Sequence, residues 1–486
     1  MRKDRLKLEF LDRDLIERVI KEAYELLCDP GVRIYSKVGL DLLSEGGAEV
    51  DYKSGIVSIP QEMVERALST VPSSFHLYNL LGEKAVHYGG DDVQFDPGSA
   101  AIEILDWNSS KPRRPVTADF VKYAKLTEGL GEFDAISTAM ICTDVPSGMG
   151  DLYRLYLALL YSKKPIVTGA FGIETLHLMK DLLTVAADGI DLTAKPRAIF
   201  DACPSSPLMW SDITCENMID CARYGIPVEV IPAPIAGASG PVTLIGSVVQ
   251  HTSEVLSGIV IHQLAKAGGP LVWGGSPSIL DVRTGTSPLG AVESIIMDCA
   301  NVQMGKHLGL PTHSYAGMSD SKVLDAQCGF ESGIGTVLAA MAHINMISGA
   351  GMLAFEECFS LEKLVIDHEL IGIARRLLKG IDLSEDPLGI DVIREVGIDG
   401  SFITAPHTLR WFNQNFIPSA VIDRDPHSIW TKKGAMDTAR RANELVYEII
   451  GKYEPIDLSW EAKEGMNAIV TQAAKRLGMS GLPSLA

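Results

Sequence analysis

Short apolar runs alternate with longer helical patterns through the middle of the chain. Between residues 130 and 360, each run is rich in Val, Ile and Ala and ends in Gly, Pro, Ser or Asp. Successive runs start roughly 30 to 40 residues apart, which is the length of a strand–helix unit. Apolar runs without alternation are typical of parallel strands that are covered on both faces. The seven predicted strands are Asp134–Cys142, Pro165–Gly172, Arg197–Cys203, Val228–Ala233, Pro270–Gly275, Pro311–Gly317 and Met346–Leu353.

An eighth strand is predicted over Asp92–Phe95, just before Pro97 and Gly98. Eight strand–helix units close a TIM (β/α)8 barrel. The alternative is an open doubly wound sheet, which favours a glycine-rich phosphate-binding turn after its first strand. Neither GxGxxG nor GxxxxGK[ST] follows the first strand here. The pattern therefore favours an α/β fold with a barrel over residues 91–360.

The two ends of the chain have a different pattern. Residues 1–90 predict an amphipathic helix over 12–27, a hairpin over 46–60 and a capped helix over 58–72, which together form an α+β accessory layer. Residues 361–486 are predicted to be helical. Because no low-complexity linker precedes these C-terminal helices, we expect them to pack on the barrel as a cap.

Composition and charge exclude several classes of protein. The chain has 486 residues, of which 46% are hydrophobic and 22% charged, as is ordinary for a soluble enzyme. Its net charge of -19, without a Lys/Arg-rich run, argues against binding to nucleic acid. The longest apolar stretches are broken before they reach membrane-spanning length, and the N-terminus lacks the apolar region of a signal peptide.

The eight cysteines include no CxxC pair, so we expect no bound metal. Free thiols are typical of the reducing cytoplasm, where we expect this protein to be found. The size of the chain and its apolar helical C-terminus lead us to expect a homo-oligomer.

Longer strings carry a more specific signal, and through them the chain resembles the trimethylamine methyltransferase family over about 400 residues. The matching strings include VDYKSGIVSIPQEMVERAL (51–68), FDPGSAA (95–101), KPIVTGA (164–170), PIAGASGPVTLIGSVVQHTSEVLSGIV (234–260), DVRTGTSPLGAVES (281–294), SDSKVLDAQCGFES (319–332), NMISGAGML (345–353) and SLEKLVID (360–367).

This resemblance implies a TIM barrel that cleaves a C–N bond in a methylated amine. The methyl acceptor would be the Co(I) of a corrinoid that is carried by a separate small protein, so this chain would bind no cofactor tightly. Archaeal members that demethylate trimethylamine carry pyrrolysine in the barrel, in a segment that we associate with DAQCGFE (325–331). Every residue of that segment is standard here. The chain therefore resembles the non-pyrrolysine branch, whose members use quaternary amines such as glycine betaine, proline betaine or carnitine.

A quaternary ammonium already carries its positive charge, and losing a methyl group leaves a neutral amine. Because the cofactor supplies the strong nucleophile, the protein needs only to bind the cation, aim one methyl group and exclude water. Aromatic faces stabilise a cation by roughly 0.5 to 2 kcal/mol each, and sites in this fold lie at the carboxyl ends of the strands. We therefore expect Trp273, Tyr315 and Phe355 to line the pocket, with Trp210 and Phe330 as weaker candidates. The alternative for each ring is ordinary core packing.

The carboxylate of a betaine needs a fixed donor. Arg283, in DVRTG, could form a bidentate clamp, although a structural salt bridge with Asp281 explains it equally well. His313 and His343 are alternative donors, and the helical surroundings of His343 favour a packing role.

Glu356, beside Glu357, could offset the charge of the ammonium group, and the alternative is a solvated loop. Gly237, Ser239 and Gly240 offer small side chains and backbone N–H groups at a strand end, where a corrinoid could approach. The alternative for them is a tight strand-to-helix turn.

Three other functions stay open. A barrel lyase or aldolase would need a Schiff-base lysine, for which Lys322 is the candidate. A zinc-dependent corrinoid methyltransferase would need a Cys/His cluster, and Cys203, Cys328 and His313 are not spaced as a recognisable site. A non-catalytic betaine-binding protein is the third alternative.

Overall fold

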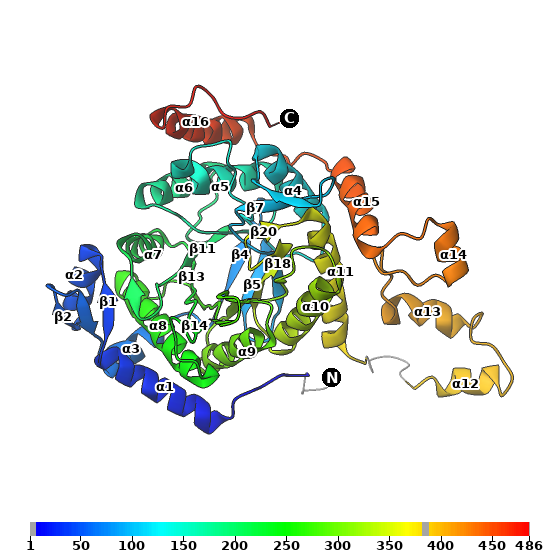
Figure 1. Cartoon of the computed structure of the whole chain (residues 1–486), viewed down its shortest axis with the longest axis horizontal. Coiled ribbons are helices and arrows are strands. Elements are labelled where there is room, and N and C mark those ends of the chain that lie inside the picture. Colours follow the sequence, from blue (N-terminus) through cyan, green and yellow to red (C-terminus); the bar gives the residue numbers. More distant parts are fainter. Residues whose placement is uncertain (1–5, 382–387, 486) are drawn as a thin grey trace.

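The structure is a computed structural model that describes residues 6–381 and 388–485, and its centre is a barrel of eight parallel strands (Figure 1). Each predicted strand overlaps one barrel strand, and β6 extends two residues beyond the predicted Asp92–Phe95. These are β6 (Gln94–Pro97), β9 (Ile136–Ser137), β10 (Ile166–Thr168), β11 (Ala198–Ala202), β13 (Val228–Val230), β15 (Leu271–Trp273), β17 (His313–Tyr315) and β18 (Met346–Ala350). The predicted TIM barrel is confirmed.

Two continuous ladders make up the barrel wall, with the orders β15-β13-β11-β10-β9 and β17-β18-β6. Backbone hydrogen bonds join them at two seams. The Trp273 N–H donates to Pro311 O at 2.9 Å, and the Asp134 N–H donates to Phe95 O, also at 2.9 Å. The ring of strands is therefore closed, which leaves no exposed sheet edge.

A ring of helices surrounds the strands (Figure 1). It consists of α4 (Thr117–Gly129), α5 (Gly150–Tyr161), α6 (Ile173–Ala186), α7 (Asp212–Tyr224), α8 (Leu244–Ala265), α9 (Val292–His307), α10 (Ala326–Met341) and α11 (Leu361–Lys379). Helix α8 has the length and hydropathy of a membrane span, but most of it is buried against other helices of the protein. Its apolar composition is accounted for by this burial.

The N-terminal layer lies on the outside of α7 and α8. It contains α1 (Arg13–Cys28), β1 (Val32–Ile34), α2 (Lys37–Gly46), β2 (Glu49–Asp51), β3 (Ile56–Ser58) and α3 (Gln61–Leu68). The predicted hairpin is the antiparallel pair β2–β3, and the two predicted helices are α1 and α3. Strand β1 pairs in parallel with β12 (Met209–Trp210), a short strand that follows β11, and thereby ties the layer to the barrel.

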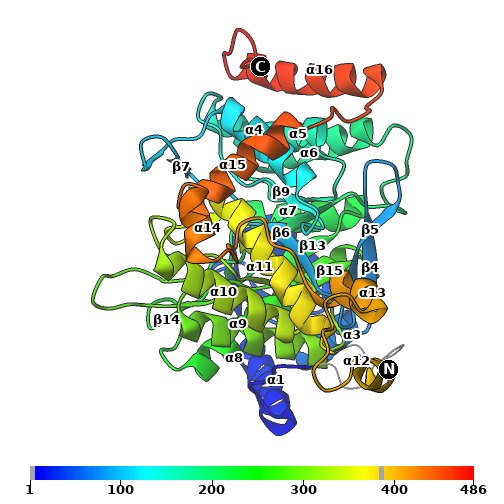
Figure 2. The same cartoon turned by 90° about the vertical axis from the view of Figure 1, so that its right-hand side faces the viewer.

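A second hairpin, β4 (Ser74–Tyr78) and β5 (Lys84–Gly89), closes the amino-terminal end of the barrel (Figure 2). The Tyr78 N–H donates to Pro196 O and the Leu80 N–H to Lys163 O, both just before barrel strands. The side chains that fill this end form one apolar cluster of Leu77, Val86, Tyr88, Ala135, Val167, Ile199, Val272 and Met346. Sequence analysis did not predict this hairpin.

At the opposite end, short strand pairs shape the loops that follow the barrel strands. Strand β14 (Ile235–Ala236) pairs with β16 (Ser278–Ile279). A four-stranded sheet contains β7 (Glu103–Asp106), β8 (Lys111–Arg113), β19 (Met352–Leu353) and β20 (Cys358–Phe359).

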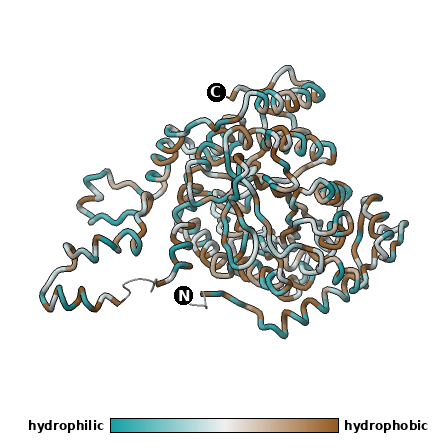
Figure 3. The backbone as a smooth tube through the Cα atoms, turned by 180° about the vertical axis from the view of Figure 1, so that it is seen from behind, coloured by the Kyte–Doolittle hydropathy of each residue, from teal (hydrophilic) through white to brown (hydrophobic). Residues whose placement is uncertain are grey.

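The C-terminal helices differ in how they pack. Helix α15 (Thr438–Gly451) lies on α11 and α4, and α16 (Trp460–Arg476) lies on α5 and α6. Between them, α12 (Ile390–Val396), α13 (Pro406–Asn415) and α14 (His427–Lys432) form an arm that stands away from the barrel (Figures 1 and 3). The arm exposes Ile398, Ile403 and Leu409. The expected packing on the barrel is thus seen for α15 and α16 and not for the arm.

A buried ion pair fixes two of the loops at the open end of the barrel. Lys363 Nζ lies 2.6 Å from Asp367 Oδ2 within α11, and both side chains are almost fully buried. Lys363 also donates to Gly317 O after β17, and Asp367 accepts from the Gly351 N–H after β18. The string SLEKLVID therefore has a structural role.

Replacing Lys363 with Met would leave the carboxylate of Asp367 buried without a counter-charge. We expect this change to lower the free energy of unfolding by about 3–5 kcal/mol, as measured by urea denaturation. The matched control is Lys37→Met, which breaks an exposed i,i+4 pair with Asp41 and should cause no measurable change. Equal effects of the two substitutions would contradict the assigned role of Lys363.

Candidate active site

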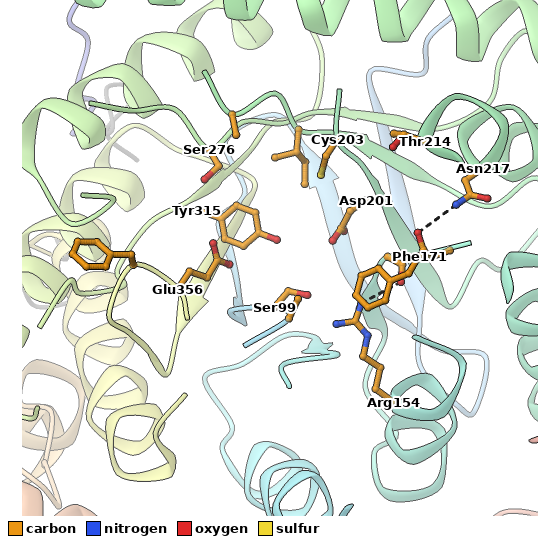
Figure 4. A pocket seen from close by; sticks show the side chains of 16 residues that line it. Ser99, Arg154, Phe171, Asp201, Cys203, Thr214, Asn217, Ser276, Tyr315 and Glu356 are labelled. Atoms are coloured by element: carbon orange, nitrogen blue, oxygen red, sulfur yellow. Dashed lines mark hydrogen bonds between the residues drawn. The ribbon is translucent and has the colours of Figure 1, made fainter. Parts of the chain in front are cut away.

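A cavity of about 540 Å³ opens at the carboxyl ends of the strands, where this fold places its active sites (Figure 4). Its volume is within the range of small-molecule sites. The wall is built from the segments that follow β6, β10, β11, β13, β15, β17 and β18, together with α5 and α7. The lining residues are Ser99, Ala100, Arg154, Gly169, Ala170, Phe171, Asp201, Cys203, Thr214, Asn217, Ile231, Ala233, Ser276, Tyr315, Phe355 and Glu356.

Buried carboxyl groups lie on and beneath the cavity floor. Asp201 on β11 and Glu229 on β13 are neighbours across the parallel ladder. Burial raises the pKa of both groups, and the charge of Asp201 raises the pKa of Glu229 further. The two carboxyl groups therefore interact as a pair that keeps its protons to a higher pH than exposed carboxyl groups do.

Next to this pair, His313, Ser348 and Asp96 form a chain of contacts between uncharged groups. His313 Nδ1 lies 3.3 Å from Glu229 Oε2, and burial lowers the pKa of His313 to about 3. The imidazole is thus uncharged, and the contact is not an ion pair. His313 Nε2 lies 3.1 Å from Ser348 Oγ, which donates to the buried carboxyl group of Asp96. Burial also raises the pKa of Asp96, so this part of the barrel interior tends to keep its protons.

Tyr315 and Glu356 lie together on another side of the cavity (Figure 4). The Tyr315 ring packs edge-on against His313, with ring centroids 4.9 Å apart. Glu356 accepts a hydrogen bond from the Ser99 N–H, and its removal from bulk water raises its pKa to about 8. Glu356 is therefore mostly protonated at pH 7 while the cavity holds no cation.

The turn that carries Glu356 is strained. Ala354, Phe355 and Glu356 have φ angles of 52°, 62° and 69°, in the left-handed region. This conformation disfavours L-residues by roughly 1–2 kcal/mol each. Strain of this kind is concentrated at functional sites, and here it directs Glu356 towards the cavity (Figure 4).

Arg154 and Phe171 face the cavity from a different side (Figure 4). The Arg154 guanidinium lies between the ends of β9 and β10, where it donates to Thr138 O at 3.0 Å and to Gly169 O at 3.2 Å. The ring of Phe171 stacks on it at 4.4 Å. Asp151 fixes this loop because its carboxylate accepts from both the Phe171 N–H and the Thr175 hydroxyl at 2.6 Å.

Three of the predicted residues lie on the cavity wall, namely Tyr315, Phe355 and Glu356. Trp273 and His313 are fully buried beside the cavity and do not belong to its wall. The indole of Trp273 packs closely against Gly305 on α9, where an added Cβ would lie 2.8 Å from the ring. Trp273 thus packs in the core, which was the alternative to its predicted place in the pocket.

The structure places the other predicted residues outside the cavity. Arg283 is exposed and forms the salt bridge with Asp281 at 2.6 Å, so the expected clamp is not formed by this arginine. The ring of Phe330 is 68% exposed on α10. Trp210 is buried and donates to Ser257, while both ring nitrogens of His343 contact backbone carbonyl groups.

Gly237, Ser239 and Gly240 form a tight turn after β14. The Gly237 N–H donates to Gly240 O, and the N–H groups of Ser239 and Gly240 donate to Ile235 O. These backbone groups are therefore engaged within the turn, in contrast to the expectation that they are free. Whether a corrinoid approaches here stays a prediction.

The residues that were candidates for the alternative functions do not come together in one site. Lys322 is exposed, with its Nζ 4.1 Å from the centre of the Phe355 ring. Cys203 is on the cavity wall, whereas Cys328 is buried on α10. In the described ranges, no three His, Cys, Asp or Glu side chains are grouped as metal ligands.

Arg154 and Asp201 were missed by the sequence analysis. A signal was present for Arg154, because it stands in GDLYRLYLALL, a helix whose side chains are all buried from Gly150 to Leu159. An arginine in such an apolar helix points to a special environment. Asp201 lies inside a predicted strand, where pattern does not tell which face a residue occupies.

Comparison with known proteins places this chain in a family of enzymes. The family model described as trimethylamine methyltransferase matches residues 1–478. The chain belongs to the trimethylamine methyltransferase family.

Relatives within the trimethylamine methyltransferase family are similar over nearly their whole length. The trimethylamine methyltransferase MttB of Methanosarcina barkeri is 30% identical over 97% of this chain and 96% of its own. A glycine betaine methyltransferase of Desulfitobacterium hafniense is 28% identical over 97% of this chain and 98% of its own. The crystal structure of the Methanosarcina barkeri monomethylamine methyltransferase MtmB covers 93% of this chain and 90% of its own, with a TM-score of 0.53 at 13% identity, and supports the fold.

The buried Glu229 should make stability depend on pH. Its pKa is higher in the folded than in the unfolded chain, so ionisation favours unfolding as the pH rises above about 4.3. Glu229→Gln removes this effect. Relative to the wild type, the variant should gain up to about 1.4 kcal/mol of stability per pH unit as the pH rises above about 4.3, as measured by urea denaturation. The exposed substitution Glu17→Gln is the control, and a Glu229→Gln curve parallel to that control would contradict the shifted pKa.

Proposed function

We propose that this protein transfers a methyl group from a quaternary amine to the Co(I) of a corrinoid that a separate protein carries in the cytoplasm. The observation that carries the proposal is the pairing of an aromatic ring, Tyr315, with a titratable carboxyl group, Glu356, in the cavity of a methyltransferase. Similarity to a glycine betaine methyltransferase supports the substrate class. The expected homo-oligomeric state stays a prediction.

The cavity is suited to a cation. The face of the Tyr315 ring can contact the ammonium group, and Asp201 lines the same cavity. The aromatic contact stabilises the cation without a fixed full charge.

Glu356 can change its own charge when the charge of the bound amine changes. Because its pKa lies near 8, it can release its proton to solvent when the cation binds. It can take the proton up again once the amine product has become neutral. The protein therefore adjusts the charge of the cavity without transferring a proton to the reacting carbon.

The corrinoid supplies the nucleophile for the methyl group when its carrier protein docks. The cavity fits such an acceptor because it is open at the end of the barrel that the β4–β5 hairpin does not close. The residues of this chain bind the amine, orient one methyl group towards the opening and exclude water from it.

The test is a spectroscopic assay with free cob(I)alamin and a panel of amines. We expect methylcobalamin to form with one or more quaternary amines, such as glycine betaine, proline betaine or carnitine, and not with trimethylamine. Turnover of trimethylamine alone would contradict the proposal. Binding of a betaine without methyl transfer, also when corrinoid protein is supplied, would instead favour the non-catalytic betaine-binding protein.

Binding of glycine betaine should depend on the ionisation of Glu356. The affinity should rise by up to about tenfold per pH unit as the pH approaches 8, and should then level off, since the carboxylate binds the cation better than the acid does. Calorimetric titrations between about pH 6 and 9 measure this. Glu356→Gln should abolish the dependence, whereas Glu357→Gln, which changes the exposed neighbour, should preserve it. A slope that persists in Glu356→Gln would assign the titration to another group.

A further inference from the structure

The guanidinium group of Arg154 is buried without a counter-ion. Its side chain is 1% exposed, and its Nε–H has no hydrogen-bond partner among the residues that the structure describes. Within the same part of the chain, no ion pair includes Arg154. Two neutral carbonyl groups accept from it, but they do not balance a full positive charge. Burial lowers the pKa of Arg154, yet a guanidinium stays protonated in proteins, so the charge remains.

The acidic groups nearest to Arg154 form no ion pair with it among the described residues. The carboxylate of Asp151 accepts from the Phe171 N–H and the Thr175 hydroxyl. Asp201 lies beside Glu229 on the next strand, and burial raises its pKa, which favours its neutral form. A buried charge without a partner is strongly unfavourable, and the open space beside Arg154 is the cavity itself.

We propose that Arg154 binds the carboxylate of the substrate, and that the cavity is therefore selective for zwitterions that carry a carboxylate close to the quaternary nitrogen. This inference rests on the proposed function, because it assigns the ammonium group of the same molecule to the side of Tyr315 and Glu356. Figure 4 shows the two groups of residues on different sides of the cavity. The cavity thus offers complementary charge to both ends of a betaine.

The surroundings of Arg154 define how it can donate. Phe171 covers one face of the guanidinium plane, so the N–H groups at the edge of the plane are the ones that can reach a ligand. Two parallel N–H groups match the two oxygens of a carboxylate and fix both distance and angle. Asn217 holds the neighbouring loop through its hydrogen bond to Ala170 O, which keeps Phe171 over the guanidinium.

The charge of the cavity favours a carboxylate over a phosphate. Arg154 is the single Lys, Arg or His among the sixteen lining residues of the described structure. One guanidinium balances one negative charge, and no other cationic side chain among the described lining residues would balance a second. A monoanion is therefore the better ligand.

Arg197 provides a matched comparison. It is also buried and lacks an ion pair among the described residues, but it donates to Ala186 O at the C-terminal end of α6. The negative end of the helix dipole offsets its charge there, and it does not line the cavity. Arg197→Gln therefore controls for the loss of a buried arginine.

The test uses calorimetric titration of the full chain with three probes. Glycine betaine carries both charges, choline carries the trimethylammonium group without a carboxylate, and 3,3-dimethylbutyrate replaces the nitrogen of glycine betaine with carbon. In Arg154→Gln, we expect binding of glycine betaine and of 3,3-dimethylbutyrate to weaken by roughly 10- to 100-fold. Choline binding should change by less than about twofold, which also shows that the cavity is intact. Arg197→Gln should bind all three probes as the wild type does.

The outcomes separate this inference from the proposed function. If Arg154→Gln binds glycine betaine as tightly as the wild type, or if it weakens choline and glycine betaine equally, the assignment of Arg154 is wrong while methyl transfer from a quaternary amine can still stand. If neither glycine betaine nor any other quaternary amine of the panel binds the wild type, the proposed function fails. Failure of 3,3-dimethylbutyrate to bind the wild type would overturn the carboxylate site itself.

Discussion

Removing a charged group from water is costly unless a partner, a proton or a ligand compensates for it, and the buried groups of this protein show the first two solutions. Lys363 and Asp367 compensate each other and thereby fix two loops. Glu229 keeps its proton beside Asp201. Arg154 has neither solution within the described chain, so its charge is left facing the cavity. Compensation is needed because the closed ring of strands and the helices packed on it exclude water from these groups.

Most of the barrel could be predicted from the sequence because its strands are buried on both faces. Runs such as PIVTGAFG and RAIFDAC are continuous in apolar residues, and each contains a barrel strand, β10 and β11. The β4–β5 hairpin was not predicted, since its alternating residues face partly the barrel and partly solvent. The arm over α12–α14 was also not foreseen, because the same apolar helical pattern occurs whether or not a helix is covered.

The site was less predictable than the fold because the direction of a side chain depends on the loop that carries it. Tyr315 and Glu356 follow strands and do face the cavity, while Trp273 ends a strand in the same way but turns into the core beside Gly305. Arg283 was the predicted donor for a substrate carboxylate, since it lies in a string that resembles the family. The structure offers Arg154 instead, on a helix where burial, not a motif, marks it as unusual.

The β4–β5 hairpin has a consequence for the sequence of events in turnover. The hairpin closes one end of the barrel with apolar side chains. Any molecule that enters the cavity therefore passes through the opposite, open end. A small amine and a bulky methyl acceptor would then use the same entrance to the cavity. Under the proposed function, the amine would bind before the acceptor arrives, and the demethylated product would leave only after the acceptor has left. The order of binding and release would then be compulsory, as a consequence of the architecture of the barrel and not of any single residue.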